Sequence, residues 1–132
     1  MTGSGGCACS SIRYRVDGPL RNVANCHCER CRRITGHFMA ASACAPGHLT
    51  IESEDTLRWY RPAEEPGVEY AFCSTCGSSL FWRAQTTPDS ISICAGTLDP
   101  PTGITTDLAL FCAEASDYHR LDQSIPMEPH DR

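Results

Sequence analysis

The chain has 132 residues, of which 41% are hydrophobic and 20% charged, as in an ordinary soluble globular protein. We therefore expect a single domain over residues 1–132, with a core at about 4–126 and a tail at 127–132. No apolar run approaches the roughly 20 residues of a membrane helix. Sixteen acidic residues against eleven basic ones, a net charge of −5, argue against a nucleic-acid-binding protein.

The predicted elements are short and mostly extended. Alternating apolar and polar residues, or short apolar runs between turns, predict strands at 12–16, 21–25, 38–44, 49–52, 57–60, 68–73, 79–82, 90–95 and 108–112. Residues 29–35 are expected to form one or two helical turns that end at Gly36. The residues after Ile125 are expected to fray. The pattern predicts a small, mainly β domain of short antiparallel sheets with little helix.

Ten cysteines are the unusual feature of the composition. The first residues, 1–6, lack the basic region and apolar stretch of a signal peptide, so we expect a cytoplasmic protein with reduced thiols. Seven cysteines fall in three clusters, Cys7/Cys9, Cys26/Cys28/Cys31 and Cys73/Cys76. Cysteines so close together are poorly placed to form disulfides with one another. They are typical of the short thiolate knuckles that bind zinc.

Seven ligands divide into a site of four and a site of three. Four thiolates form a closed structural zinc site, whereas three leave an open position that can bind a ligand. The compact Cys26/Cys28/Cys31 cluster can hold one zinc alone, and Cys7, Cys9, Cys73 and Cys76 would then staple distant segments together. In the alternative, His27 or another cysteine completes the smaller site, and both zincs are structural. We expect Cys44, Cys94 and Cys112, which stand alone in apolar stretches, to pack in the core.

These motifs resemble a known family. The resemblance covers the chain from about residue 4 to Pro126. It rests on five segments in the family's order: Gly6–Cys9, Asn25–Arg32, Gly36, Phe72–Ser78 and Ala95–Asp99. They are similar to the glutathione-dependent formaldehyde-activating enzymes, also called the centromere-protein-V-like (CENP-V) family. The resemblance implies a zinc-stapled β-tent, a structural zinc on Cys7, Cys9, Cys73 and Cys76, and a second zinc on Cys26, Cys28 and Cys31. The chain departs from the family pattern at Tyr118, where tryptophan is common, and at Glu69–Ala71, where a basic residue is common.

The resemblance also implies an activity, the joining of formaldehyde to glutathione to give S-(hydroxymethyl)glutathione, a carbon–sulfur lyase reaction. Three thiolates and one zinc carry a net charge of about −1, which suits the holding of a thiolate better than the activation of water. We therefore predict a lyase-type enzyme with two zincs and a small thiol–aldehyde adduct as its partner. The alternative is a non-catalytic zinc-binding interaction module or a thiol-responsive switch.

Residues near the second cluster are candidates for contacts with the substrate. Arg32 can grip a carboxylate of glutathione or belong to a solvated face, and for its neighbours Arg30 and Arg33 the solvated face is favoured. We assign further substrate contacts to Gly36 and Phe38. His27 and His37 are candidate proton carriers, although structural packing is favoured for His27 and simple exposure to solvent for His37. His48, His119 and His130 receive no role.

Overall fold

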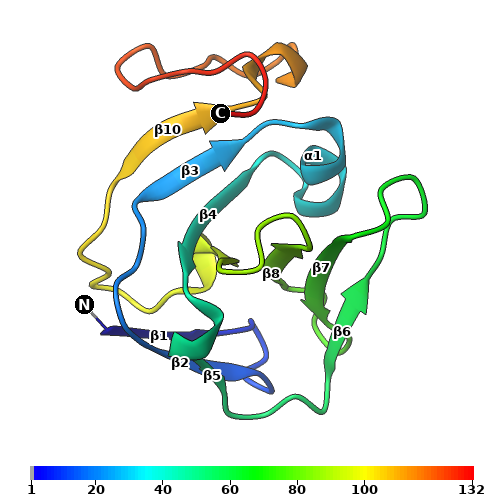
Figure 1. Cartoon of the computed structure of the whole chain (residues 1–132), viewed down its shortest axis with the longest axis vertical. Coiled ribbons are helices and arrows are strands. Elements are labelled where there is room, and N and C mark those ends of the chain that lie inside the picture. The colour runs from blue at the N-terminus through cyan, green and yellow to red at the C-terminus, as the bar shows by residue number, and fades with distance from the viewer. Residues whose placement is uncertain (1) are drawn as a thin grey trace.

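The computed structural model describes residues 2–132, which form two β-sheets and one α-helix (Figure 1). The helix, α1, spans Glu29–Thr35, and short 3-10 turns lie at Pro46–His48, Ala95–Thr97 and Cys112–Glu114. Within the described range, the strands are β1 (Thr2–Gly6), β2 (Arg13–Asp17), β3 (Val23–Cys26), β4 (Met39–Cys44), β5 (Leu49–Ile51), β6 (Leu57–Tyr60), β7 (Val68–Cys73), β8 (Ser79–Ala84), β9 (Ile91–Cys94) and β10 (Thr106–Leu110).

The small sheet has the order β1-β2-β5, and the large sheet has the order β10-β3-β4-β9-β8-β7-β6. Every pairing between neighbouring strands is antiparallel except one: β10 runs parallel to β3, with Leu110 opposite Cys26. The predicted mainly β, β-tent architecture is thus confirmed, and this single parallel pair is the departure from it. In Figure 1 the small sheet lies below the large one, and α1 lies at the upper right beside β4.

The main core lies between the two sheets. Tyr14 and Val16 of β2 are buried against Phe81 of β8 and Ile93 of β9. The rings of Tyr14 and Phe81 meet edge to face, with their centroids 5.2 Å apart. Burial of one such side chain stabilises the fold by about 1.5–3 kcal/mol relative to an exposed position. The alternation of buried and exposed residues along β2 is the pattern that predicted this strand.

The sequence did not predict β1, because Gly and Ser residues are poor strand formers. The structure shows why small residues stand there. The hydroxyl of Tyr14 bonds to that of Thr97 at 2.6 Å, directly over Gly5. A Cβ atom at Gly5 would collide with that hydroxyl and with the Thr97 carbonyl. The glycine therefore permits the close approach of β1 and β2 that the buried tyrosine requires.

The C-terminal residues are ordered against β10, contrary to the expected fraying. The amides of Phe111 and Cys112 donate to the carbonyls of His130 and Glu128, at 3.0 Å in each case. Met127 forms a β-bridge with Ala109. Figure 1 shows this segment, in orange and red, beside β10. It covers the edge of the sheet that would otherwise expose unpaired backbone groups. In residues 2–132, no helix has both the length and the apolar character needed to cross a membrane.

Candidate metal centres

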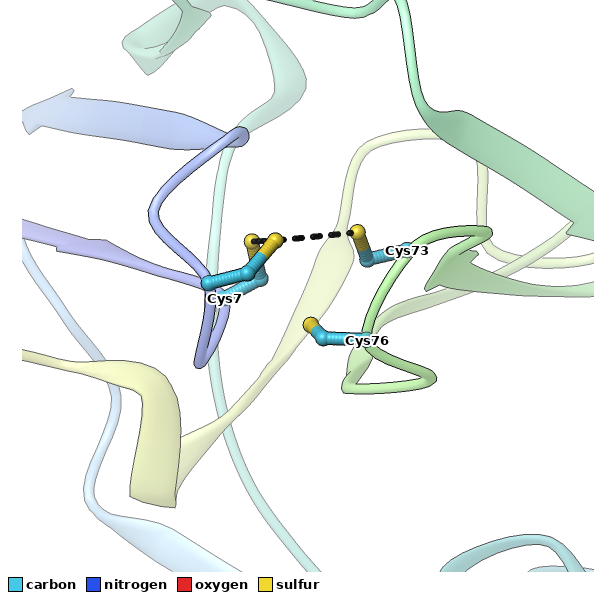
Figure 2. Close-up of side chains that lie close together, drawn as sticks. Cys7, Cys73 and Cys76 are labelled. Carbon is cyan, nitrogen blue, oxygen red and sulfur yellow. Dashed lines mark hydrogen bonds between the residues drawn. The ribbon is translucent and has the colours of Figure 1, made fainter.

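The first centre brings four cysteines together from two distant parts of the chain. Cys7 and Cys9 lie in the turn between β1 and β2, Cys73 ends β7, and Cys76 lies in the turn before β8. Their four sulfurs lie within 4.8 Å of one another. Figure 2 shows the sulfurs of Cys7, Cys73 and Cys76 turned toward a common centre.

The sulfur spacing fits a tetrahedral zinc. With Zn–S bonds of about 2.3 Å, the sulfurs of a regular tetrahedron are about 3.8 Å apart. The sulfur of Cys9 lies 3.6 Å from that of Cys7 and 3.8 Å from that of Cys73. These two distances match such a site, and all four sulfurs lie within 4.8 Å of one another, so the donor set suits a closed zinc site.

Polar groups around this cluster favour thiolates. The hydroxyl of Ser11 lies 3.0 Å from the sulfur of Cys9 and 3.4 Å from that of Cys73. Hydrogen bonds with the hydroxyls of Ser11 and Thr56 lower the pKa of Cys73 to about 5. The turn after Cys73 closes through a 2.8 Å bond from the amide of Gly77 to the Cys73 carbonyl, with Gly77 at φ 77°. Glycine adopts this left-handed conformation without strain.

The second centre is local and has three cysteines. Cys26 ends β3, Cys28 caps α1, and Cys31 lies in the first turn of the helix. The three sulfurs lie within 4.8 Å of one another, with Cys31 buried and the other two half-buried. No further Cys, His, Asp or Glu of residues 2–132 joins this group. A zinc here would have three protein ligands, the arrangement that leaves a coordination position open.

The second cluster and α1 are built together. The amide of Cys31 donates to the sulfur of Cys28 at 3.3 Å, so a candidate metal ligand is also the N-terminal cap of the helix. Hydrogen bonds from Cys26 and Cys31 lower the pKa of Cys28 to about 2. At the other end, Gly36 has φ 89° and its amide bonds to the Arg32 carbonyl at 2.8 Å. Gly36 thus ends the helix as predicted.

Tyr70 is a candidate site residue that the sequence analysis missed. It lies on β7, is 4% exposed, and places its hydroxyl 3.5 Å from the sulfur of Cys31. Burial raises the pKa of Tyr70, followed in size by the effect of Cys31, so the hydroxyl keeps its proton. No spacing in the sequence joins Tyr70 to Cys31, because they are 39 residues apart.

Three histidines gather beside the second cluster. His27 is 2% exposed and its ring centroid lies 4.8 Å from that of Phe38 and 5.3 Å from that of His119. Burial lowers the pKa of His27, and His119 and His37 lower it further. His119 also contacts His37 edge to face at 4.7 Å. The sequence analysis gave His119 no role, and the structure places its ring beside His27 and His37 because the folded C-terminal segment brings it there.

The three arginines around α1 are engaged by the protein itself. Arg30 pairs with Glu64 at 3.2 Å and also with Glu65. Arg33 pairs with Glu29 at 3.0 Å across one helical turn. Arg32 donates to the carbonyl of Glu114 at 3.0 Å and so holds the segment that leads toward His119. The role of Arg32 in binding substrate stays a prediction.

A groove lies between α1 and β4 on one side and the turn before β8 on the other. It consists of two adjoining cavities of about 270 and 350 Å³, which share Ile34, Met39, Gly77 and Ser79. Tyr70 lines the first cavity, and Phe38 and Cys94 line the second. Phe38 thus lines one of these cavities, and its contact with a substrate stays a prediction.

The isolated cysteines differ from one another. Cys44 is buried in the main core, as expected. Cys94 is half-buried at the groove and packs against the core cluster that contains Cys31. Burial raises the pKa of its thiol to about 12. Cys112 is half-buried at the end of β10, so the expectation of simple core packing holds fully for Cys44 alone.

Known proteins resemble this chain in sequence and in fold. The family model of the glutathione-dependent formaldehyde-activating enzymes matches residues 2–114. This chain belongs to that family. A crystal structure of a Rhodobacter sphaeroides protein, solved as a structural-genomics target, is also similar. It is 21% identical, covers 78% of this chain and 97% of its own, and has a TM-score of 0.63. At that identity the likeness supports the shared fold alone. Residues 115–132, which include Tyr118 and His119, lie beyond the matched range.

Proposed function

We propose that this protein is a zinc-dependent enzyme of the carbon–sulfur lyase type, acting on the adduct of an aldehyde with glutathione or a similar thiol. The supporting observation is the inequality of the two sulfur clusters, one with four donors and one with three. Family membership favours formaldehyde as the aldehyde. When bound at Cys26, Cys28 and Cys31, zinc supplies an open position that stabilises an incoming thiol as its thiolate.

The reaction is an addition. A carbon–sulfur bond forms, the π bond of the aldehyde carbonyl breaks, and the proton lost by the thiol ends on the carbonyl oxygen. The reverse reaction releases the aldehyde and the thiol. No oxidant or reductant is needed.

The protein's own side chains orient the reactants and carry the proton. Tyr70 keeps its proton and can donate a hydrogen bond to sulfur or oxygen next to Cys31. His27 and His119, stacked beside the cluster, are candidates to exchange that proton with solvent. Gly36 and Phe38 place the end of the helix at the groove, and Phe38 walls it. Ligand cysteines must stay reduced, so we infer a reducing compartment such as the cytoplasm.

The test is the rate of exchange between formaldehyde, thiol and adduct, measured by exchange NMR with zinc-loaded protein. The proposal predicts acceleration over the spontaneous reaction, lost in Cys31→Ser. Cys112→Ser, which alters a cysteine outside both clusters, is the matched control and should keep the rate. Failure of every thiol, charged or neutral, to show acceleration with full metal content would favour the non-catalytic binding module.

A further inference from the structure

The groove beside the second cluster is apolar. Ile34 and Met39 lie along its length, and Phe72 and Phe81 add aromatic surface. Tyr70 lines the groove and also contacts Cys31, so this one side chain joins the groove to the second cluster. Cavities of this size accept small organic molecules.

No charged side chain lines either cavity in the part of the chain that the structure describes. The chain contains no lysine, so every cationic side chain apart from histidine is one of its eleven arginines. The three arginines nearest in sequence to the cluster are engaged with Glu64, Glu65, Glu29 and the Glu114 carbonyl. The net charge of −5 adds no general attraction for an anion.

Glutathione is a poor match for such a surface. It carries two carboxylates and an ammonium group, and a carboxylate moved from water to an apolar wall without a partner loses binding energy. A neutral apolar substituent instead gains from contact with Ile34, Met39 and the aromatic rings. The uncharged lining of the groove therefore discriminates between thiols that share the same reactive group but differ in the charge of their substituents.

We propose that the thiol whose adduct this site handles carries an uncharged, largely apolar substituent, which occupies the groove walled by Ile34, Met39 and Phe81. This inference rests on the proposed function and narrows its substrate class. In this assignment Arg32 supports the C-terminal segment through its bond to the Glu114 carbonyl and does not bind a substrate carboxylate.

Two thiols with the same branched skeleton provide the test. Isoamyl mercaptan is neutral and ends in an isopropyl group. β-Mercaptopropionate ends in a carboxylate that has a similar shape but carries a negative charge. Each is titrated, alongside glutathione, into protein with cobalt at the metal sites, and the visible spectrum gives the dissociation constant. We expect isoamyl mercaptan to bind tighter than either charged thiol by about tenfold or more. A smaller preference, or a preference for a charged thiol, overturns the inference.

A change of charge at the rim gives a second measurement. Tyr60 lines the first cavity and is 45% exposed, so Tyr60→Arg should fold normally. We expect Tyr60→Arg to bind β-mercaptopropionate about threefold tighter or more, with no gain for isoamyl mercaptan. Tyr60→Gln controls for the lost ring, and Thr50→Arg on the exposed surface of β5 controls for net charge. An equal gain in Thr50→Arg would place the effect outside the groove and overturn the assignment.

The two proposals fail in different ways. If charged thiols bind and react as well as neutral ones, the enzyme proposal stands and the assignment of an apolar substrate falls. If no thiol changes the cobalt spectrum or exchanges with formaldehyde faster than in buffer, the proposed function falls, and the inference that rests on it falls too.

Discussion

The two sulfur clusters are both built from cysteines, but one joins distant segments of the chain and the other is local. The four-cysteine cluster joins segments 64 residues apart, as the contact between Cys9 and Cys73 shows. The three-cysteine cluster is contained in the six residues from Cys26 to Cys31 and is built on the first turn of α1. A link across a long loop restrains the unfolded chain strongly, whereas a link across a few residues restrains it little. We therefore expect the first cluster to serve stability and the second to serve chemistry.

The largest effect should follow the loss of the long-range link. Cys73→Ser removes a candidate ligand that is 0% exposed and that lies with Cys7 and Cys9 of the turn between β1 and β2. Because structural zinc binding is itself folding free energy, we expect a loss of several kcal/mol out of the roughly 5–15 kcal/mol of a typical domain. The variant should be unfolded or insoluble, as judged by circular dichroism and a thermal melt. Normal melting of soluble Cys73→Ser would show that this cluster is dispensable for the fold.

Cys31→Ser should separate the second cluster from the first. We expect the sheets to persist, with a smaller fall in melting temperature than in Cys73→Ser, and both the second zinc and the exchange activity to disappear. The measurement is a melt combined with elemental zinc analysis. Collapse equal to that of Cys73→Ser would mean that both clusters are structural, and full activity would remove Cys31 from the site.

The double role of Cys28 allows a finer comparison. Cys28→Ser and Cys28→Ala both lose a metal ligand, but serine keeps a side-chain acceptor for the Cys31 amide. With the second metal absent from both, we expect Cys28→Ala to be less stable than Cys28→Ser by about 1 kcal/mol. Urea unfolding measures the difference. Equal stability would show that the cap contributes nothing once the metal has gone.

Tyr70→Phe should have the smallest effect on stability and a distinct effect on chemistry. The ring stays buried and only the hydroxyl beside Cys31 is lost, so we expect a change in unfolding free energy within about 1 kcal/mol. Zinc content should be unchanged, while the exchange rate falls. An unchanged rate at full zinc content would show that Tyr70 serves packing alone.

The elements near the cysteines could be predicted because their signals are local. Helical residues followed by Gly36 predicted α1, and alternation predicted β2. The division into four and three sulfurs followed from spacing, and the structure brings together the same sets. By contrast, β1 could not be predicted, because Gly5 is required by the close packing of Tyr14 on the neighbouring strand.

The features that sequence reasoning missed depend on contacts between distant residues. The parallel pairing of β10 with β3, and of the C-terminal residues with β10, leaves no periodic signal in either segment. His119 reaches His27 only because that segment folds back over the second cluster, and Tyr70 reaches Cys31 only through the packing of β7. The two cysteine clusters were therefore recognisable in the sequence, whereas the side chains around them were not.

The two candidate metal sites are expected to differ in kind. Native mass spectrometry of protein purified without chelators, followed by stepwise addition of a zinc chelator, tests this point. We predict two zincs per chain, with one removed first while the fold is retained and the second removed only with unfolding. A single zinc per chain, or the loss of two zincs together with the fold in one step, would contradict the distinction between a structural centre and an open one.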